Sequence, residues 1–297
     1  MTDQNILLII NPVAGRKIAK KLIYRIVDLL CRNNYKTTIF STGDKGEAAQ
    51  FVKAHAHEFN KIICCGGDGT LNETFTGLID AGINIPVGYI PTGTTNDLAT
   101  ALKLTKNPKK AMQISVEGNN RVHDLGVFND DRYFTYIASF GAFTSVAYRT
   151  PQWMKNSLGR AAYFINGVPS LTDIQPHKAK VIADGTQIEG EFVFGSVTNS
   201  TIIGGIIKLN ESEVHFDDGL FEVMLVRNPE TPMDLSKSIQ CIVSHEYDEE
   251  YVLFLRAKEV LFTFEEPTDW TVDGEFAGTV NVADIKNLQG RAEIVVK

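Results

Sequence analysis

The stretch KIICCGGDGTLNETFTGLIDA, residues 61–81, decides the fold of this chain. Its first five residues are apolar except for Lys61 and predict a buried strand, which GGDGT at residues 66–70 ends. Apolar residues then recur at helical spacing and predict an amphipathic helix with Leu71, Phe75, Leu78 and Ile79 on one side. A strand that passes through glycines directly into a helix is typical of a parallel α/β sheet.

The same pattern continues on both sides of this stretch. Residues 6–10, 35–41 and 87–90 predict further strands, and residues 17–31 and 45–59 predict helices. The first of these helices repeats apolar residues at helical spacing, at Ile18, Leu22, Ile26 and Leu29. Alternating strands and helices predict a parallel sheet, in which the loops after the strands meet at the edge where ligands bind.

The pattern changes after about residue 124. Short alternating strands follow, with hairpin signals such as ADGTQ at residues 183–187, and helical patterns occur only near residues 142–168 and 233–243. The fold class is therefore α/β plus β, in two domains. We place the α/β domain at residues 1–125, to which residues 286–297 return, and the β-rich domain at residues 126–285.

Composition limits the classes of function. A formal net charge of -7 argues against a nucleic-acid partner, because binding through phosphates requires a basic face. The chain contains no run of about 18 apolar residues and no signal peptide, so we expect a cytoplasmic protein whose membrane contact is peripheral. The cysteines lack the spacing of metal ligands, and we interpret all four as small buried apolar residues: Cys31, Cys64, Cys65 and Cys241.

Three predicted strand ends carry loops suited to an anionic ligand: NPVAG at residues 11–15, GGDGT at 66–70 and PTGTTND at 91–97. Glycines let backbone amides approach an anion, and the following helix directs its positive end the same way. Asp68 would repel phosphates unless a divalent cation lay between them, which indicates Mg²⁺. Taken alone, residues 66–70 also fit a tight turn with Asp68 near the start of a helix.

The motifs NPVAGRK, GGDGTLNE and PTGTTNDLA resemble the three nucleotide-binding motifs of the diacylglycerol kinase catalytic domain. That domain is shared with bacterial lipid kinases and sphingosine kinases and is related to NAD kinases. The resemblance extends through HDLG at residues 123–126, DDGLFEV at 217–223 and VDGE at 272–275. It implies a Rossmann-like lobe of three layers, as in phosphofructokinase and NAD kinase, followed by an antiparallel β-sandwich lobe.

The resemblance also implies an ATP site, a catalytic Mg²⁺ and a general base. Asp68 and Asp124 would hold the Mg²⁺, and Glu275 would take the proton from the acceptor hydroxyl. Without the resemblance, VDGE fits an ordinary hairpin turn equally well. The residues implied to bind ATP are Asn11, Pro12, Val13, Ala14, Gly15, Thr42, Gly66, Gly67, Asp68, Gly69, Thr70, Asn72, Glu73 and Thr94.

A second, structural Mg²⁺ is implied at DDGL, held by Asp218 and the carbonyl groups of His215 and Leu220. Oxygen ligands suit Mg²⁺, but Asp-Gly is also the commonest hairpin turn. Residues 208–213 depart from the family, in which a run containing proline is more usual at this place.

The function implied is transfer of the γ-phosphoryl group of ATP to the hydroxyl of diacylglycerol, giving phosphatidic acid, at the inner face of the membrane. The acceptor could instead be phosphatidylglycerol, a sphingoid base or the ribose of NAD, and a catalytically silent nucleotide-binding protein is the alternative of another class. Related enzymes are often homodimers. A basic run could contact nucleotide phosphates or anionic lipid headgroups, or could be a solvated helix face: Arg16, Lys17, Lys20, Lys21 and Arg25. A second group could line a lipid entrance or could be ordinary core packing: Trp153, Met154, Lys155, Arg160, Tyr163 and Phe164.

Overall fold

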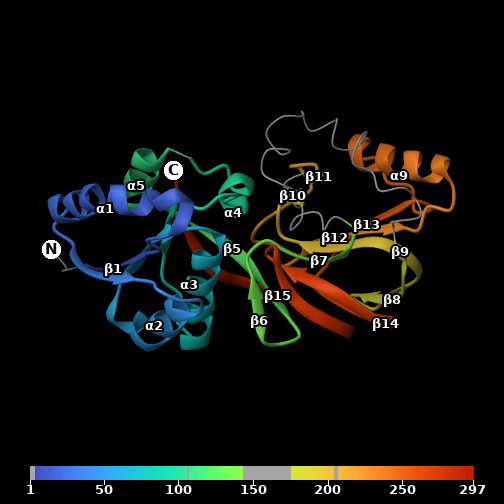
Figure 1. Ribbon diagram of the computed structural model, residues 1–297, viewed down its shortest axis with the longest axis horizontal. Coiled ribbons are helices and arrows are strands. Elements are labelled where there is room, and N and C mark those ends of the chain that lie inside the picture. The colour runs from blue at the N-terminus through green and yellow to red at the C-terminus, as the bar shows by residue number, and fades with distance from the viewer. Residues whose placement is uncertain (1–3, 106, 143–174, 204–206) are drawn as a thin grey trace. The chain divides into compact units, whose positions relative to one another are not determined.

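The computed structural model describes residues 4–105, 107–142, 175–203 and 207–297. The chain forms two compact units (Figure 1): unit 1 comprises Met1–Leu125 and Leu288–Lys297, and unit 2 comprises Gly126–Asn287. The chain passes from one unit to the other within two long strands, β5 (Asn119–Phe128) and β15 (Glu275–Val296). The helix predicted beyond residue 142, with Trp153 and its neighbours, lies outside the described residues.

Unit 1 contains a parallel sheet in the order β15-β4-β3-β1-β2. Its strands are β1 (Asn5–Ile10), β2 (Lys36–Ser41), β3 (Lys61–Gly66) and β4 (Val87–Pro91), joined by the last part of β15. The residues of β1, β3 and β4 are almost all buried, as expected for parallel strands that are covered on both faces.

Helices follow the strands of unit 1 in the chain. They are α1 (Ala14–Arg32), α2 (Glu47–His55) with the short η1 (Ala56–Glu58), α3 (Asp68–Ala81), α4 (Asp97–Ala101) and α5 (Pro108–Glu117). Helix α3 packs on α2 through Gly77, where an added Cβ would lie 2.6 Å from the carbonyl oxygen of Ala49. Within the described residues, no helix is long and apolar enough to cross a membrane.

The buried face of α1 differs in part from the prediction. Leu22, Ile26 and Leu30 are buried, whereas the predicted Leu29 is only partly buried. Cys31 is exposed, so the interpretation of all four cysteines as buried residues was wrong at this position. One residue along a helix rotates the side chain by about 100°, which carries Cys31 off the face that Leu30 occupies. The other three cysteines are buried.

Unit 2 is antiparallel. Its main strand order is β13-β12-β9-β7-β14-β15, and β8 pairs with both β9 and β14. The turn between β8 and β9 lies at Asp184 and Gly185, within the predicted hairpin. The elements are β6 (Arg132–Phe134), β7 (Ile137–Gly141), β8 (His177–Ala183), β9 (Thr186–Thr198), β10 (Ile202–Ile203), β11 (Ile207–Lys208), β12 (Phe221–Arg227), α9 (Pro232–Ser244), β13 (Val252–Ala257) and β14 (Glu259–Val272).

An aromatic cluster fills the core of unit 2. Trp270 is fully buried, and its ring centroid lies 5.1 Å from those of both Phe140 and Phe262. Phe140 also packs edge-on against Phe264 at 5.0 Å. Tilted and edge-to-face contacts at these distances are favourable for aromatic pairs. This core supports the ends of β7 and β14, next to the hairpin that carries Glu275.

Candidate functional site

The loop between β3 and α3 depends on its glycines. A Cβ on Gly66 would lie 2.6 Å from Cβ of Thr70, so only glycine allows the chain to turn back this tightly. Gly67 is the N-cap residue of α3 and has no side chain with which to cap the helix. Asp68 is the first helical residue, and Gly69 and Thr70 complete the first turn. The positive end of α3 therefore begins at a loop that brings backbone close to any ligand.

The first predicted loop is bound to this turn. The side-chain amide of Asn11 donates to Oγ1 of Thr70 at 3.2 Å, and its backbone amide donates to the carbonyl of Cys65 at 3.0 Å. Oδ1 of Asn11 accepts from the amides of Val13 and Ala14, both at 3.1 Å, and so satisfies two backbone donors where α1 begins. Pro12 lies inside this cap, and Gly15 follows in α1.

Thr42, at the end of β2, lies beside the same strand end. Its amide donates to the carbonyl of Ile10 at 2.9 Å, and its side chain is buried. The structure thus places this predicted residue next to the loop that begins at Asn11.

The third predicted loop packs directly on the second. The amide of Thr92 donates to the carbonyl of Gly66 at 2.8 Å, and a Cβ on Gly93 would lie 2.6 Å from Cα of Gly67. Asn96, at a left-handed φ of 50°, fixes the loop because its Oδ1 accepts from the amide of Gly93 at 2.9 Å. Thr94 lies at the exposed tip.

Asp68 links the second and third loops. Its Oδ2 accepts from Oγ1 of Thr95 and from the amide of Asp97, both at 3.1 Å, at the start of α4. Nearby, burial raises the pKa of Tyr89 well above its ordinary value, and the negative charges of Asp68 and Asp97 add to the shift. The neutral phenol donates to Oδ1 of Asn96 at 3.2 Å.

Glu73 has a partner that the sequence did not indicate. Its two carboxylate oxygens accept from the amides of Gly46 at 2.8 Å and Ala48 at 3.3 Å, which lie at the start of α2. Oδ1 of the preceding Asn72 accepts from Oγ1 of Thr76 at 3.4 Å. Glu73 therefore caps α2 from α3, and a role toward a nucleotide remains a prediction.

Asp124 lies on β5 within unit 1 and is fully buried. Its Oδ1 accepts from the amide of Gly290, on the returning strand β15, at 2.7 Å.

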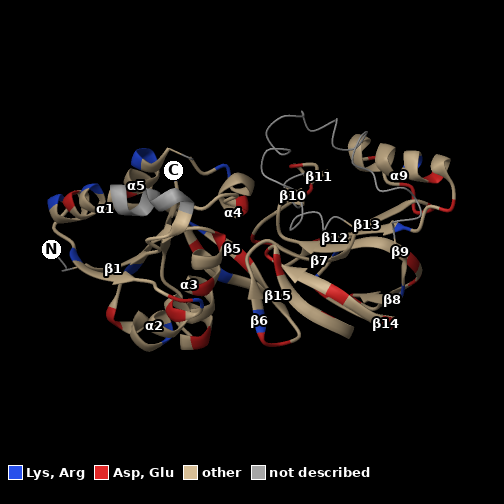
Figure 2. Ribbon diagram, viewed as in Figure 1, with Lys and Arg blue, Asp and Glu red and all other residues tan. Residues whose placement is uncertain are grey.

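Acidic positions are prominent on α3, and basic ones on α1 and α5 (Figure 2). Among the described residues, no group of three or more acidic, histidine or cysteine side chains could by itself hold a metal ion.

Glu275 belongs to unit 2, whereas Asp68 and Asp124 belong to unit 1. It is the first residue of β15, directly after the two-residue turn Asp273-Gly274, and its side chain is 48% exposed. Nη2 of Arg132 lies 3.8 Å from its Oε2. VDGE is therefore a hairpin turn, and the turn presents Glu275 at the surface of its unit.

Asp273 is a partly buried carboxylate whose partners the sequence did not reveal. It accepts from the amide and hydroxyl of Thr135, at 2.7 and 2.8 Å, and from the amides of Tyr136 and Ile137, at 3.1 and 3.2 Å. Burial raises the pKa of Asp273, although these donors act to lower it. The Asp-Gly pair in VDGE was the available signal, but it indicates only the turn.

At DDGL, residues 217–220, the guanidinium of Arg256 supplies a positive charge. Oδ1 of Asp218 accepts from the amide of Leu220 at 3.0 Å, and Oδ2 binds the guanidinium of Arg256. Arg256 also lies 3.4 Å from Glu222, its cross-strand partner, which is fully buried. Burial raises the pKa of Glu222 to about 8, and Arg256 acts in the opposite direction. Both oxygens of Asp218 therefore have protein partners, and the structural Mg²⁺ expected with His215 and Leu220 remains a prediction.

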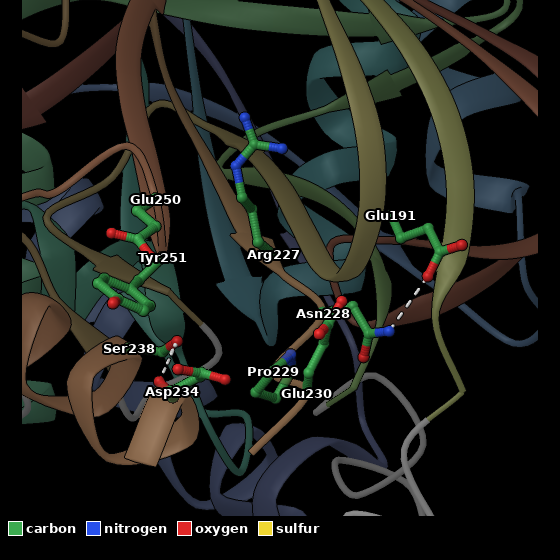
Figure 3. A pocket seen from close by; sticks show the side chains of 9 residues that line it. All are labelled: Glu191, Arg227, Asn228, Pro229, Glu230, Asp234, Ser238, Glu250 and Tyr251. Carbon is green, nitrogen blue, oxygen red and sulfur yellow. Dashed lines mark hydrogen bonds between the residues drawn. The ribbon is translucent and has the colours of Figure 1, made fainter. Parts of the chain in front are cut away.

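A cavity of about 500 Å³ lies in unit 2 beside the start of α9 (Figure 3). Four of its lining residues are acidic, Arg227 is its cation, and Asn228 donates to Glu191 at 3.1 Å. None of the predicted site residues lines it. Its polar and acidic character is unsuited to acyl chains. The lining residues are Glu191, Arg227, Asn228, Pro229, Glu230, Asp234, Ser238, Glu250 and Tyr251.

Comparisons with known proteins cover both units. Residues 5–128 match the family described as "Diacylglycerol kinase catalytic domain", and residues 137–289 match "YegS C-terminal NAD kinase beta sandwich-like domain". The diacylglycerol kinase of Bacillus subtilis (strain 168) is 30% identical over 291 residues, which are 97% of this chain and 95% of that protein. The diacylglycerol kinase of Staphylococcus carnosus (strain TM300) is 28% identical, over 97% of this chain and 93% of that protein.

Solved structures show the same fold over the whole chain. A diacylglycerol kinase structure from Bacillus anthracis str. Sterne matches with a TM-score of 0.77 at 23% identity, covering 100% of this chain and 98% of that one. Another structure from the same organism matches with a TM-score of 0.82 at 25% identity, covering 100% and 96%.

The contact between Gly67 and Gly93 predicts the effect of Gly93→Ala. The added Cβ would lie 2.6 Å from Cα of Gly67 and 2.8 Å from Oδ1 of Asn96, so one loop must move. We expect ATP affinity, measured by isothermal titration calorimetry, to fall by about tenfold, equivalent to about 1.4 kcal/mol. Gly43→Ala is the control, because its Cβ would meet only the end of the Glu47 side chain at 3.4 Å. Equal ATP affinity in both variants would contradict the assignment of these loops.

The pair of Arg256 with buried Glu222 predicts a pH-dependent loss of stability in Arg256→Met. The raised pKa means that Glu222 stabilises the fold when protonated and that this contribution declines between pH 4.5 and about 8. Without Arg256 the folded pKa rises further, so the decline continues above pH 8. We expect the melting temperature of Arg256→Met to fall further below that of wild type at pH 9 than at pH 6. Exposed Lys258→Met is the control, and a pH-independent difference would contradict the pairing.

Proposed function

Because the chain belongs to the diacylglycerol kinase family, we propose that it transfers the γ-phosphoryl group of ATP to the hydroxyl of diacylglycerol, giving phosphatidic acid. The observation that carries the proposal is the joining of three strand-end loops at the first turn of α3. Asn11 reaches Thr70, Gly67 packs on Gly93, and Asp68 binds the loop before α4.

The nucleotide would lie against these loops. Glycines at positions 66, 67 and 93 let the second and third loops pack closely on each other, and the positive end of α3 lies at the same turn. Phosphate recognition by backbone amides requires this close approach, which side chains would block. Asn11, Thr42 and Thr94 would flank the nucleotide, with Pro12, Val13, Ala14, Gly15, Asn72 and Glu73 nearby.

Asp68 and Asp124 fit a catalytic Mg²⁺ by their chemistry. Both are carboxylates of unit 1, and Mg²⁺ prefers hard oxygen ligands with retained waters. Hydrogen bonds from Thr95 and Asp97 orient Asp68, and one from Gly290 orients Asp124. When bound, the ion would neutralise charge on the transferring phosphates. A structural Mg²⁺ at Asp218, with the carbonyl groups of His215 and Leu220, remains a prediction, and Arg256 is a second source of positive charge at that carboxylate.

Glu275 is the proposed general base. Its half-exposed carboxylate at the start of β15 is accessible to an acceptor, as the role requires. The acceptor is a membrane lipid, so we also propose transient contact with the inner face of the membrane. The homodimer expected from relatives remains a prediction.

An acceptor panel tests the proposal. Purified protein is incubated with labelled ATP, Mg²⁺ and mixed micelles containing diacylglycerol, phosphatidylglycerol or a sphingoid base, with NAD in a separate reaction. We expect label in phosphatidic acid. If label appears only in another product, the acceptor that yields it is the substrate in place of diacylglycerol. If the protein binds ATP but forms no labelled product, a catalytically silent nucleotide-binding protein is favoured.

The two carboxylates predict separate variants. Asp68→Asn removes the proposed Mg²⁺ ligand, and Glu275→Gln removes the base, so each should lower kcat by about 10²–10⁴-fold. Asp80→Asn and Glu265→Gln, which alter exposed acidic residues of the same two units, are the matched controls and should retain activity. Melting temperatures check that every variant is folded. Full activity in Glu275→Gln would remove the base from the proposal.

A further inference from the structure

The hairpin that carries Glu275 has a fixed geometry. Asp273 and Gly274 have φ values of 47° and 78°, and the residues on either side of them, Val272 and Glu275, pair across the strands. Two left-handed residues in a two-residue loop match the twist of a hairpin, which explains the Asp-Gly pair. The backbone of Glu275 therefore has one position relative to β14.

Asp273 binds this hairpin to the start of β7. Its carboxylate accepts four hydrogen bonds from residues 135–137, and its amide donates to the carbonyl of Ile137 at 2.9 Å. Separating the turn from β7 would remove all four hydrogen bonds from this partly buried carboxylate, which is unfavourable. The backbone beside Glu275 is thereby held in place from the inside of unit 2.

Arg132 approaches the hairpin from β6. Its Nη1 donates to the carbonyl of Phe276 at 2.8 Å, and Nη2 lies 3.8 Å from Oε2 of Glu275. The preceding turn is also bound to β15: the amide of Asn129 donates to the carbonyl of Asp284, and the amide of Asp284 donates to Oδ1 of Asn129, both at 2.8 Å. The β5–β6 hairpin therefore meets β15 at two places, which fixes the origin of the arginine side chain.

These contacts limit the orientation of the Glu275 side chain. Its backbone is fixed, but its side chain has three rotatable torsions and is 48% exposed, so packing alone does not select one rotamer. The guanidinium is a rigid fork. With one arm on the backbone of Phe276, the other arm lies at a set place beside the carboxylate.

We propose that Arg132 is a positioning residue that holds the carboxylate of Glu275 in the orientation needed for proton abstraction. This inference rests on the proposed function, in which Glu275 is the general base. Arg132 acts through Glu275 and not on the phosphates, so its loss should affect turnover and leave nucleotide binding unchanged. Small errors in the placement of a reacting group lower the rate strongly.

The test compares Arg132→Gln and Arg132→Lys with the control Lys178→Gln, which removes another partly exposed cation from an ion pair of unit 2. We expect Arg132→Gln to lower kcat by about tenfold and to leave KM for ATP within about twofold of wild type. This combination is expected when the carboxylate of Glu275 is misplaced and nucleotide binding is intact. Arg132→Lys, which keeps the charge and loses the fork, should recover part of the rate. Lys178→Gln should behave as wild type.

A double variant separates positioning from general damage to the fold. If Arg132 acts only through Glu275, adding Arg132→Gln to Glu275→Gln should lower kcat by less than about twofold, because effects that act through one group are not additive. An additive tenfold loss, or a matching rise in KM for ATP, would overturn the inference. If Glu275→Gln is itself fully active, the proposed base fails. If Glu275→Gln is inactive and Arg132→Gln is normal, only this inference fails.

Discussion

Side chains on the first two turns of α3 bind each neighbouring loop of unit 1. Asp68 binds the loop before α4, Thr70 accepts from Asn11, and Glu73 caps α2. Asp68 lies on a different side of the helix from Thr70 and Glu73, and the three side chains together fix three separate segments. Gly66 and Gly67 allow Thr70 and the loop at Gly93 to approach closely where the helix begins. The three loops are therefore held together around one helix start, as the proposed nucleotide site requires.

At Asp68, the hydrogen bonds that hold the loops are compatible with the proposed role as a metal ligand. Asp68 receives hydrogen bonds from Thr95 and Asp97 through Oδ2, which orients the carboxylate in a way that a metal site also requires. Glu73 differs, because both of its oxygens already cap α2. A change at Glu73 would therefore act on the placement of α2 before it acted on a nucleotide. Membership of a motif does not by itself show that a residue contacts the ligand.

The sequence predicted the strands and helices of unit 1 well because buried apolar runs and helical spacing are local signals. It also placed the turns at residues 183–187 and 272–275, because Asp-Gly pairs favour left-handed conformations. It could not identify Arg132, Asp273 or the pair of Glu222 with Arg256, whose partners lie 34 to 144 residues away in the chain. The error at Cys31 had a different origin: residue type predicts average burial, whereas the rotation of α1 decides it at each position.

In both units, hydrogen bonds to a carboxylate hold a segment of backbone in place. In unit 1, the carboxylates of Asp68 and Glu73 in α3 hold neighbouring segments through hydrogen bonds. In unit 2, the hydrogen-bonded carboxylate of Asp273 fixes a turn, so that the next acidic residue, Glu275, can remain half-exposed without losing its backbone position. If the proposed base lay at the end of a long, free loop, it would have to be ordered at each turnover, at a cost in conformational entropy. Next to a hydrogen-bonded β-turn only the side chain of Glu275 remains to be ordered, and Arg132 is a neighbouring group that contacts it.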